Sequence, residues 1–133
     1  MSDAIKRAVA SYTAAWTQRD PELRADLLAR AVTEDVRIVI GAGQRAIVGR
    51  AALEAEIAAF HRRFPVTHIR MTSGVQVQGN LARFTGQAEG SDGPIGAEAY
   101  DTCECDPSGR IRVLFTFAGV TLPPADGASE PAA

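Results

Sequence analysis

The second half of the chain is a series of four long segments in which apolar and polar residues alternate. These segments cover about residues 66–78, 81–90, 95–105 and 110–120. Alternation of this kind predicts β-strands with one buried face, and the short turn sequences between the segments predict antiparallel neighbours. The segments exceed the usual strand length, so we expect the sheet to bend, with Gly74 and Gly86 as kink sites.

The first half of the chain carries the pattern of three helices and two short strands. The expected helices span about residues 4–18, 21–31 and 50–64, and the expected strands span 36–40 and 46–48. The residues that share the apolar face of the first helix are Ile5, Val9, Tyr12 and Trp16. The second helix follows the capping residue Asp20, and we expect it to bury Leu23, Leu27 and Leu28. Helices followed by a run of strands indicate the α+β class.

The length of the chain, 133 residues, is that of one domain. We expect a single domain over residues 1–121. Residues 122–133 are rich in proline, alanine and other small residues, and this composition predicts a disordered C-terminal tail.

The charge and cysteine content of the chain exclude several classes of partner. The formal net charge of −2 gives no electrostatic reason to expect nucleic acid or a membrane. Cys103 and Cys105 are too few for a disulfide framework, and we find neither a signal segment nor a stretch of about 20 apolar residues. We therefore expect a cytoplasmic protein. The cysteines and the histidines, His61 and His68, lack the spacing of zinc ligands, so we expect no metal and no other cofactor.

Alternation also assigns the side chains of each strand to two faces. The apolar face of the 95–105 strand consists of Ala97, Ala99, Cys103 and Cys105. Asp101 lies on the same face. The expected inward-facing residues of the last strand are Ile111, Val113, Phe115 and Phe117. Thr116 falls on the opposite, polar face.

Asp101 is the residue of this pattern that most needs a physical reason. A carboxylate among small apolar side chains is costly to ionise unless it is hydrogen-bonded or wet. Burial can tune such a group for acid–base chemistry or keep it neutral as a hydrogen-bond donor. Alternatively, Asp101 caps a bulge or bonds to a buried backbone group. Its small neighbours leave open volume around the carboxyl group, which favours a functional role, and both interpretations stay open.

The order of the elements resembles the nuclear transport factor 2-like (cystatin-like) superfamily, and within it the SnoaL-like polyketide cyclases and the ketosteroid isomerases. The resemblance covers about residues 5–120. It rests on Trp16 before Arg19-Asp20-Pro21, on Gly49-Arg50-Ala51-Ala52-Leu53, on Arg63-Phe64-Pro65, and on Asp101 before Gly109-Arg110-Ile111. It implies a cone-shaped, curved antiparallel sheet packed on three helices around an apolar pocket, and a homodimer.

The resemblance also implies roles for individual residues. In the isomerases a Tyr and a protonated Asp hold a developing enolate while a second Asp moves the proton. Tyr12, eight residues before Asp20, matches the Tyr, and Asp101 matches the Asp donor. In the SnoaL-like cyclases an Asp on this strand is the acid–base residue. Ile40 occupies the position of the isomerase base, and since isoleucine cannot move a proton, steroid isomerisation by two Asp residues is not expected.

The other candidate residues have structural interpretations beside the functional ones. Tyr12 is either a pocket donor or a core aromatic residue with one partner for its hydroxyl. His61 is either a satisfied structural group or an acid–base partner of Asp101. The expected pocket walls, which indicate an apolar ligand, are Trp16, Ile40, Phe60, Met71, Phe84, Phe115 and Phe117.

Two functions fit these residues. The first is a cofactor-independent enzyme that isomerises, cyclises or dehydrates a small apolar carbonyl compound through an enolate. In it Asp101 acts as the acid–base group or a neutral donor, and Tyr12 and His61 assist. The second is a non-catalytic ligand-binding or dimerisation module on the same fold. An open cavity of a few hundred cubic ångströms near Asp101 would favour a ligand site, and a filled, closed core would favour the module.

Overall fold

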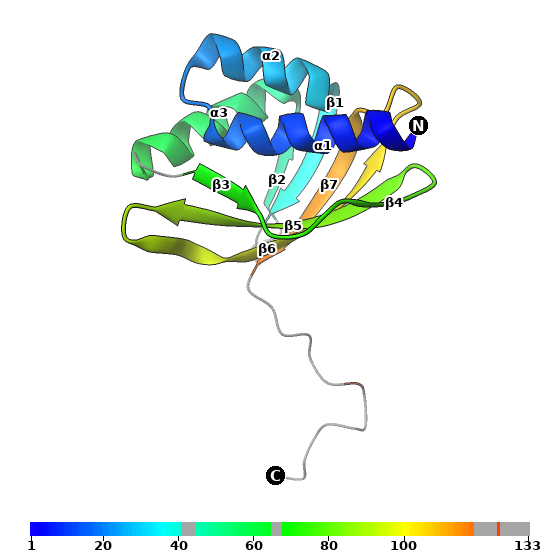
Figure 1. Cartoon of the computed structure of the whole chain (residues 1–133). Coiled ribbons are helices and arrows are strands. Elements are labelled where there is room, and N and C mark those ends of the chain that lie inside the picture. The colour runs from blue at the N-terminus through cyan, green and yellow to red at the C-terminus, as the bar shows by residue number, and fades with distance from the viewer. Residues whose placement is uncertain (41–44, 65–67, 119–124, 126–133) are drawn as a thin grey trace.

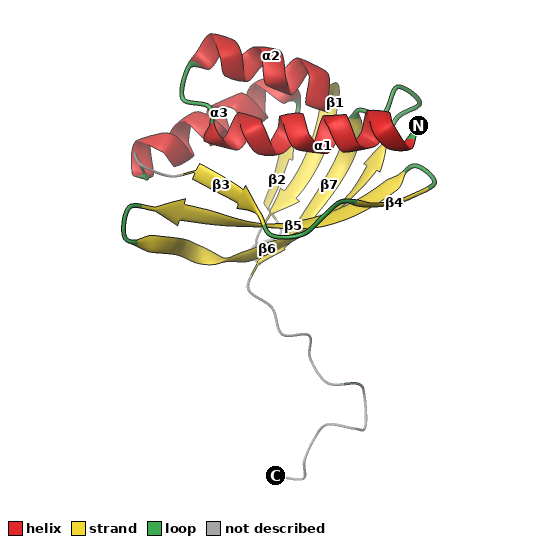
Figure 2. Ribbon diagram, viewed as in Figure 1, coloured by secondary structure: helices red, strands yellow, loops and turns green. Residues whose placement is uncertain are grey.

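A computed structural model describes residues 1–40, 45–64, 68–118 and Ala125. Over these ranges three helices lie on one face of a curved seven-stranded sheet (Figure 1). Figure 2 shows that the other face of the sheet carries no helix in the described part of the chain. The α+β class, with helices packed on a curved sheet, is confirmed. The tail expected at 122–133 lies outside the described residues, except for Ala125.

The helices begin and end close to the expected residues. Helix α1 spans Ser2–Thr17, α2 spans Pro21–Ala31 and α3 spans Arg50–Arg63. The start of α2 is fixed by Asp20, whose carboxylate accepts hydrogen bonds from the N–H groups of Glu22 and Leu23 at 2.9 and 3.3 Å. Such a cap satisfies backbone donors that have no partner within the helix.

The sheet has the strand order β2-β1-β7-β6-β5-β3, and β4 also pairs with β5. The strands are β1 (Val32–Ile40), β2 (Arg45–Val48), β3 (His68–Met71), β4 (Gln76–Gln78), β5 (Leu81–Gly90), β6 (Gly93–Cys105) and β7 (Ile111–Ala118). Among the described pairs, β1 and β7 run parallel and the others antiparallel.

The strand expected at 66–78 is interrupted and forms β3 and β4. Between them the hydroxyl oxygen of Ser73 accepts a hydrogen bond from the backbone N–H of Thr85 at 2.8 Å. This side chain takes the place of a backbone acceptor, so the regular ladder stops there. The interruption lies beside Gly74, one of the two expected kink sites.

The core lies between the helices and the sheet, and one helix presents an unexpected face to it. The largest fully buried aliphatic side chains are Ile5, Leu28, Ile38, Leu53, Ile57, Ile111 and Leu114. In α2, however, Leu23 is 52% exposed and Arg24 only 3% exposed. The prediction that Leu23 is buried is therefore wrong, because α2 turns Arg24 toward α3, where Glu54 pairs with its guanidinium at 2.8 Å.

A one-residue bulge in β7 reverses the faces expected for that strand. Cys105 pairs with Ile111, but Glu104 pairs with Val113, so Arg112 is an extra residue without an opposite partner. After such a bulge every later side chain points to the face opposite to the one that simple alternation assigns. Leu114 is accordingly buried, although alternation from Ile111 places it outside.

The turn between β6 and β7 packs tightly against the start of α1. Gly109 has a φ of 91°, a conformation that favours glycine. A Cβ atom at this position would lie 2.7 Å from the Cβ of Ala4 and 3.0 Å from its carbonyl carbon. Gly79 has a φ of 60°, but no atom lies within 4 Å of a Cβ placed there. A substitution at Gly79 therefore adds backbone strain without a steric clash.

We predict that Gly109→Ala lowers the free energy of unfolding by about 2–4 kcal/mol, because it combines backbone strain with overpacking. Gly79→Ala adds only backbone strain and should lower it by about 1 kcal/mol. Urea unfolding of both variants measures the difference. Equal losses would show that the contact with Ala4 contributes nothing.

Candidate active-site pocket

An apolar cavity of about 180 Å³ lies between the sheet and helices α1 and α3. It is lined by Tyr12, Thr13, Trp16, Ile40, Phe60, Ile69, Met71, Phe84, Thr85, Gly86, Gln87, Ala88, Ala97, Ala99, Asp101 and Thr116. Five of the seven expected wall residues are among these. The region around Asp101 is therefore an open cavity and not a filled core, which favours a ligand site.

Asp101 lies in the wall of this cavity, as the alternation of β6 predicts. Its Oδ1 atom accepts a hydrogen bond of 2.6 Å from the hydroxyl group of Thr116, the residue directly opposite on β7. Loss of hydration on burial raises the pKa of Asp101 to about 6, and the hydrogen bond from Thr116 opposes this rise. At neutral pH the group is mostly ionised, yet it is a much better proton acceptor than a solvated aspartate.

Tyr12 supplies a neutral donor close to this carboxyl group. Its side chain is 5% exposed and lines the cavity. Burial raises its pKa most strongly, the charge of Asp101 raises it further, and a hydrogen bond with the side chain of Trp16 opposes these effects. The phenol thus keeps its proton at physiological pH. Tyr12 and Asp101, which the sequence proposed as partners, are brought together at one cavity.

Thr116 is the residue of this group that the sequence analysis missed. Simple alternation placed it on the polar face, and the bulge at Arg112 turns it into the cavity. The sequence does contain a signal, because Val113, Leu114 and Phe115 are three consecutive apolar residues. Such a run is compatible with either face being buried, so the alternation there was ambiguous.

The same bulge turns Phe115 and Phe117 away from the cavity. They are 40% and 63% exposed, and they pair with Thr102 and Tyr100 on the outer face of the sheet. The prediction that these two phenylalanines form pocket walls is therefore wrong. The aromatic walls of the cavity are instead Trp16 and Phe60 from the helices, whose rings meet edge to face at 5.4 Å, and Phe84 from β5.

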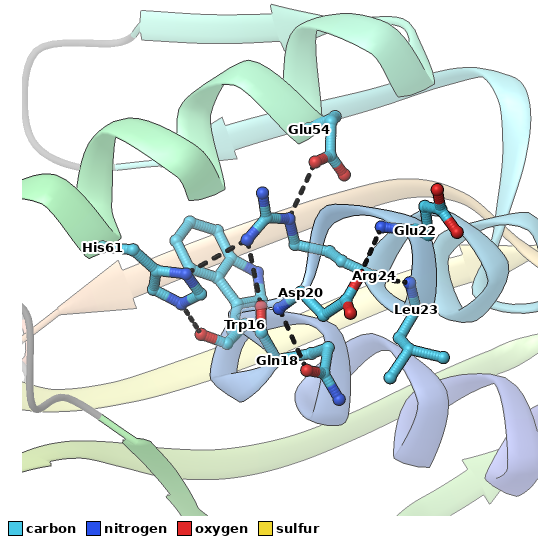
Figure 3. A network of polar contacts seen from close by, with 8 residues as sticks. All are labelled: Trp16, Gln18, Asp20, Glu22, Leu23, Arg24, Glu54 and His61. Carbon is cyan, nitrogen blue, oxygen red and sulfur yellow. Dashed lines mark hydrogen bonds and ion pairs between the residues drawn. The ribbon is translucent and has the colours of Figure 1, made fainter.

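His61 does not reach the cavity, and its ring is held by a network of polar contacts between the three helices (Figure 3). Its Nε2 atom lies 2.6 Å from the carbonyl oxygen of Trp16, which can only accept a hydrogen bond. Its Nδ1 atom lies 3.1 Å from a guanidinium nitrogen of Arg24, which can only donate. These partners require the neutral tautomer with the proton on Nε2. Of the two interpretations of His61, the structural one therefore holds, and a pairing with Asp101 is absent from the described residues.

Arg24 is the centre of this network. Besides His61, it donates to the carbonyl oxygen of Gln18 at 3.0 Å and to a carboxylate oxygen of Glu54 at 2.8 Å. The contacts join the end of α1 to α2 and α3, and the joined segments include the cavity residues Trp16 and Phe60. A buried arginine is tolerated only when its donors are paired in this way.

The described residues contain no group of His, Cys, Asp and Glu side chains arranged to hold a metal ion. Cys103 and Cys105 are both buried, and a hydrogen bond between the two thiols contributes to raising the pKa of Cys103 and lowering that of Cys105. None of the described helices has the length and hydrophobicity that crossing a membrane requires.

Comparison with known proteins supports the resemblance seen in the sequence. Neither a family model nor a curated protein sequence matches this chain. Among solved structures, a candidate isomerase of the SnoaL-like family from Agrobacterium tumefaciens is 26% identical, with a TM-score of 0.75 over 85% of this chain and 95% of that one. The fold is that of the SnoaL-like proteins.

More distant SnoaL-like and isomerase-like structures share the same fold. A candidate SnoaL-like polyketide cyclase from a Jannaschia species is 14% identical, with a TM-score of 0.70 over 86% of this chain and 85% of that one. A candidate ketosteroid isomerase from Kribbella flavida is 19% identical, with a TM-score of 0.66 over 94% of this chain and 84% of that one. Identities this low show the fold and leave the chemistry to the residues of this pocket.

The raised pKa of Asp101 predicts a specific dependence of stability on pH. Between about pH 3.8 and 6 the folded protein keeps a proton on Asp101 that the unfolded chain has lost, so stability falls as the pH rises through this window. Asp101→Asn removes the effect. The variant should be more stable than wild type above pH 6, by up to about 3 kcal/mol, and no more stable below pH 4. Urea unfolding from pH 3.5 to 8 measures this, and a variant less stable at pH 8 would contradict the prediction.

The network in Figure 3 predicts that His61 contributes to stability and not to the chemistry at Asp101. His61→Leu leaves Arg24 and the carbonyl group of Trp16 each without one partner, so we expect a loss of about 2–4 kcal/mol in the free energy of unfolding. His68→Leu is the matched control, because His68 is exposed and pairs only with Glu89 at the surface. Equal losses for the two variants would contradict this role.

Proposed function

We propose that this protein is a cofactor-independent enzyme that removes a proton from the carbon next to the carbonyl group of a small apolar compound. The observation that carries the proposal is a mostly ionised carboxylate, with a pKa of about 6, in the wall of an apolar cavity beside a protonated phenol. A base and a donor placed in this way can form an enolate and return the proton elsewhere. Isomerisation, cyclisation and dehydration all pass through such a species.

The roles of the residues follow from their charge states. Asp101 accepts the proton from carbon, because its pKa lies near neutrality. Tyr12 donates a hydrogen bond to the carbonyl oxygen, where negative charge develops. Thr116 fixes Oδ1 of Asp101 and leaves Oδ2 without a partner among the described residues. Ile40 forms part of the apolar wall, so proton transfer depends on Asp101 and not on an acid at the end of β1.

Hydrogen–deuterium exchange at carbon tests this proposal without knowledge of the natural substrate. We expect the protein in D₂O to speed deuterium incorporation next to the carbonyl group of small ketones such as cyclohexanone, measured by proton NMR. Asp101→Asn should slow this exchange by about 100-fold or more, the usual effect of losing a positioned acid–base group. Asp92→Asn, a matched change in the exposed β5–β6 turn, should leave the rate unchanged.

The pH profile of the exchange shows whether Asp101 acts as an ionised base or as a protonated acid. If Asp101 is the base, the rate rises as the pH passes through about 6. Thr116→Val removes a hydrogen bond that lowers the pKa of Asp101, so the rise should move to higher pH. Exchange that is equally fast in Asp101→Asn would refute the catalytic proposal and favour a non-catalytic binding module.

We further propose that two copies of the chain associate through the outer face of the sheet, which carries no helix in Figure 2. Tyr100, Phe115 and Phe117 are 43%, 40% and 63% exposed there; Tyr100 and Phe117 are partners across β6 and β7, and Phe115 lies two residues before Phe117, opposite Thr102. Exposed aromatic residues gathered on one face are typical of a contact surface.

Substitution within this aromatic surface tests the association. We predict that sedimentation shows a dimer for wild type and a monomer for Phe117→Glu, because a charge cannot be buried there without a partner. Leu23→Glu is the control, since Leu23 is also a large exposed apolar residue but lies on α2, away from the sheet. A monomeric wild-type protein would overturn this proposal.

A further inference from the structure

The shape of the cavity carries information on the ligand beyond the chemistry at Asp101. Its lining on β5 and β6 includes four residues with no side chain or a single methyl group, namely Gly86, Ala88, Ala97 and Ala99, next to the larger Phe84, Thr85, Gln87 and Asp101. Gly86 and Ala99 are direct partners across the two strands. Because these four small residues carry no long side chain, the part of the wall that they form leaves room for a ring between the sheet and the helices.

The opposite wall of the cavity is aromatic. Trp16 from α1 and Phe60 from α3 line it, with their rings 5.4 Å apart and nearly perpendicular. Figure 1 shows α1 and α3 lying over one face of the sheet, and residues from both layers line the cavity. A floor of small residues on the sheet, with aromatic rings opposite it, makes a slot that fits a planar apolar group better than a puckered one.

The volume limits how many rings the slot can hold. The cavity measures about 180 Å³. This is close to the roughly 150 Å³ of an engineered apolar cavity that holds one benzene molecule, and below the roughly 300–1,000 Å³ of pockets for drug-sized ligands. One ring with a short substituent fills this space, and a fused four-ring compound would extend out of it into solvent.

The polar groups of the cavity determine the orientation of the ligand. Tyr12 and Asp101 stand at one end, and Gln87 lines the cavity nearer the β5–β6 bulge. The side-chain amide of Gln87 donates to the carbonyl oxygens of Ala88, Gly96 and Ile95 at 3.0, 3.2 and 3.4 Å. Its N–H groups are thus engaged, so of Tyr12 and Gln87 it is Tyr12 that has a proton to donate to a ligand oxygen.

We infer that the ligand is a planar single-ring carbonyl compound, or its enol, held with the ring between the small residues of β5 and β6 and the pair Trp16–Phe60, and with its oxygen toward Tyr12. The carbonyl part of this inference rests on the proposed function. The single planar ring rests on the shape and volume of the cavity alone.

Binding of phenols of increasing size tests the ring number, since a phenol is a stable planar analogue of an enol. We expect 4-fluorophenol, followed by fluorine NMR, to bind at least tenfold more tightly than a fluorinated naphthol or a four-ring phenol. Cyclohexanol, which matches phenol in size but is puckered, should compete at least tenfold less well than phenol. Equal or tighter binding of the larger phenols, or no binding of any phenol by the folded protein, would overturn the inference.

Matched substitutions place the phenol in the slot. Ala99→Leu fills the floor and should weaken 4-fluorophenol binding at least tenfold, whereas Ala59→Leu, the same change on the exposed side of α3, should not alter it. Phe60→Ala enlarges the slot and should improve naphthol binding, a gain that misfolding cannot produce. Naphthol binding unchanged by Phe60→Ala, or phenol binding unaltered by Ala99→Leu, would contradict the assignment.

The two proposals fail separately. Tight binding of 4-fluorophenol together with Asp101-independent ketone exchange would refute the catalytic proposal and retain the single-ring ligand. Asp101-dependent exchange together with preferred binding of larger phenols would refute the ring number and retain the catalytic proposal.

Discussion

The hydrogen bond from Thr116 to Asp101 depends on a single extra residue in β7, and the chemistry of the pocket depends on that bond. With Arg112 inserted opposite the junction of Glu104 and Cys105, Thr116 faces the cavity directly beside Asp101. If Arg112 instead paired with Glu104 in a regular ladder, Phe115 would lie opposite Asp101, and the buried carboxyl group would lose the donor that Thr116 supplies. One hydroxyl group partly offsets the lost hydration and leaves the pKa at about 6, between a solvated carboxylate and a fully buried acid.

The cavity exists because the helices are held away from the sheet by contacts made elsewhere. Arg24 and His61 join the end of α1 to α2 and α3 through buried and partly buried hydrogen bonds, so Trp16 and Phe60 stay in place without filling the space above β6. Small residues on β5 and β6 then leave the volume open. The pocket adjoins the core, since Tyr12 and Phe84 belong to both, and the buried aliphatic residues of the core supply the stability that lets a costly carboxylate persist.

The order of the helices and strands and the position of Asp101 in the cavity wall could be predicted from the sequence, because both leave local signals. Asp20-Pro21 marks the start of α2, and a lone carboxylate in an apolar alternation marks Asp101. The failures have long-range causes. The face of β7 depends on a bulge that a run of three apolar residues leaves ambiguous, so Thr116 was missed and Phe115 and Phe117 were misplaced. The partners of His61 come from residues 37 and 45 positions away, which no local pattern reveals.

The measurement that tests the central claim most directly is the titration of the Asp101 carboxyl carbon by ¹³C NMR in the wild-type protein, with Asp101→Asn used to assign the signal. A midpoint near pH 6 is the predicted result, since burial outweighs the single hydrogen bond from Thr116. A midpoint near the ordinary value of 3.8 would show that the carboxyl group is solvated, and it would remove the physical basis for a base at this position.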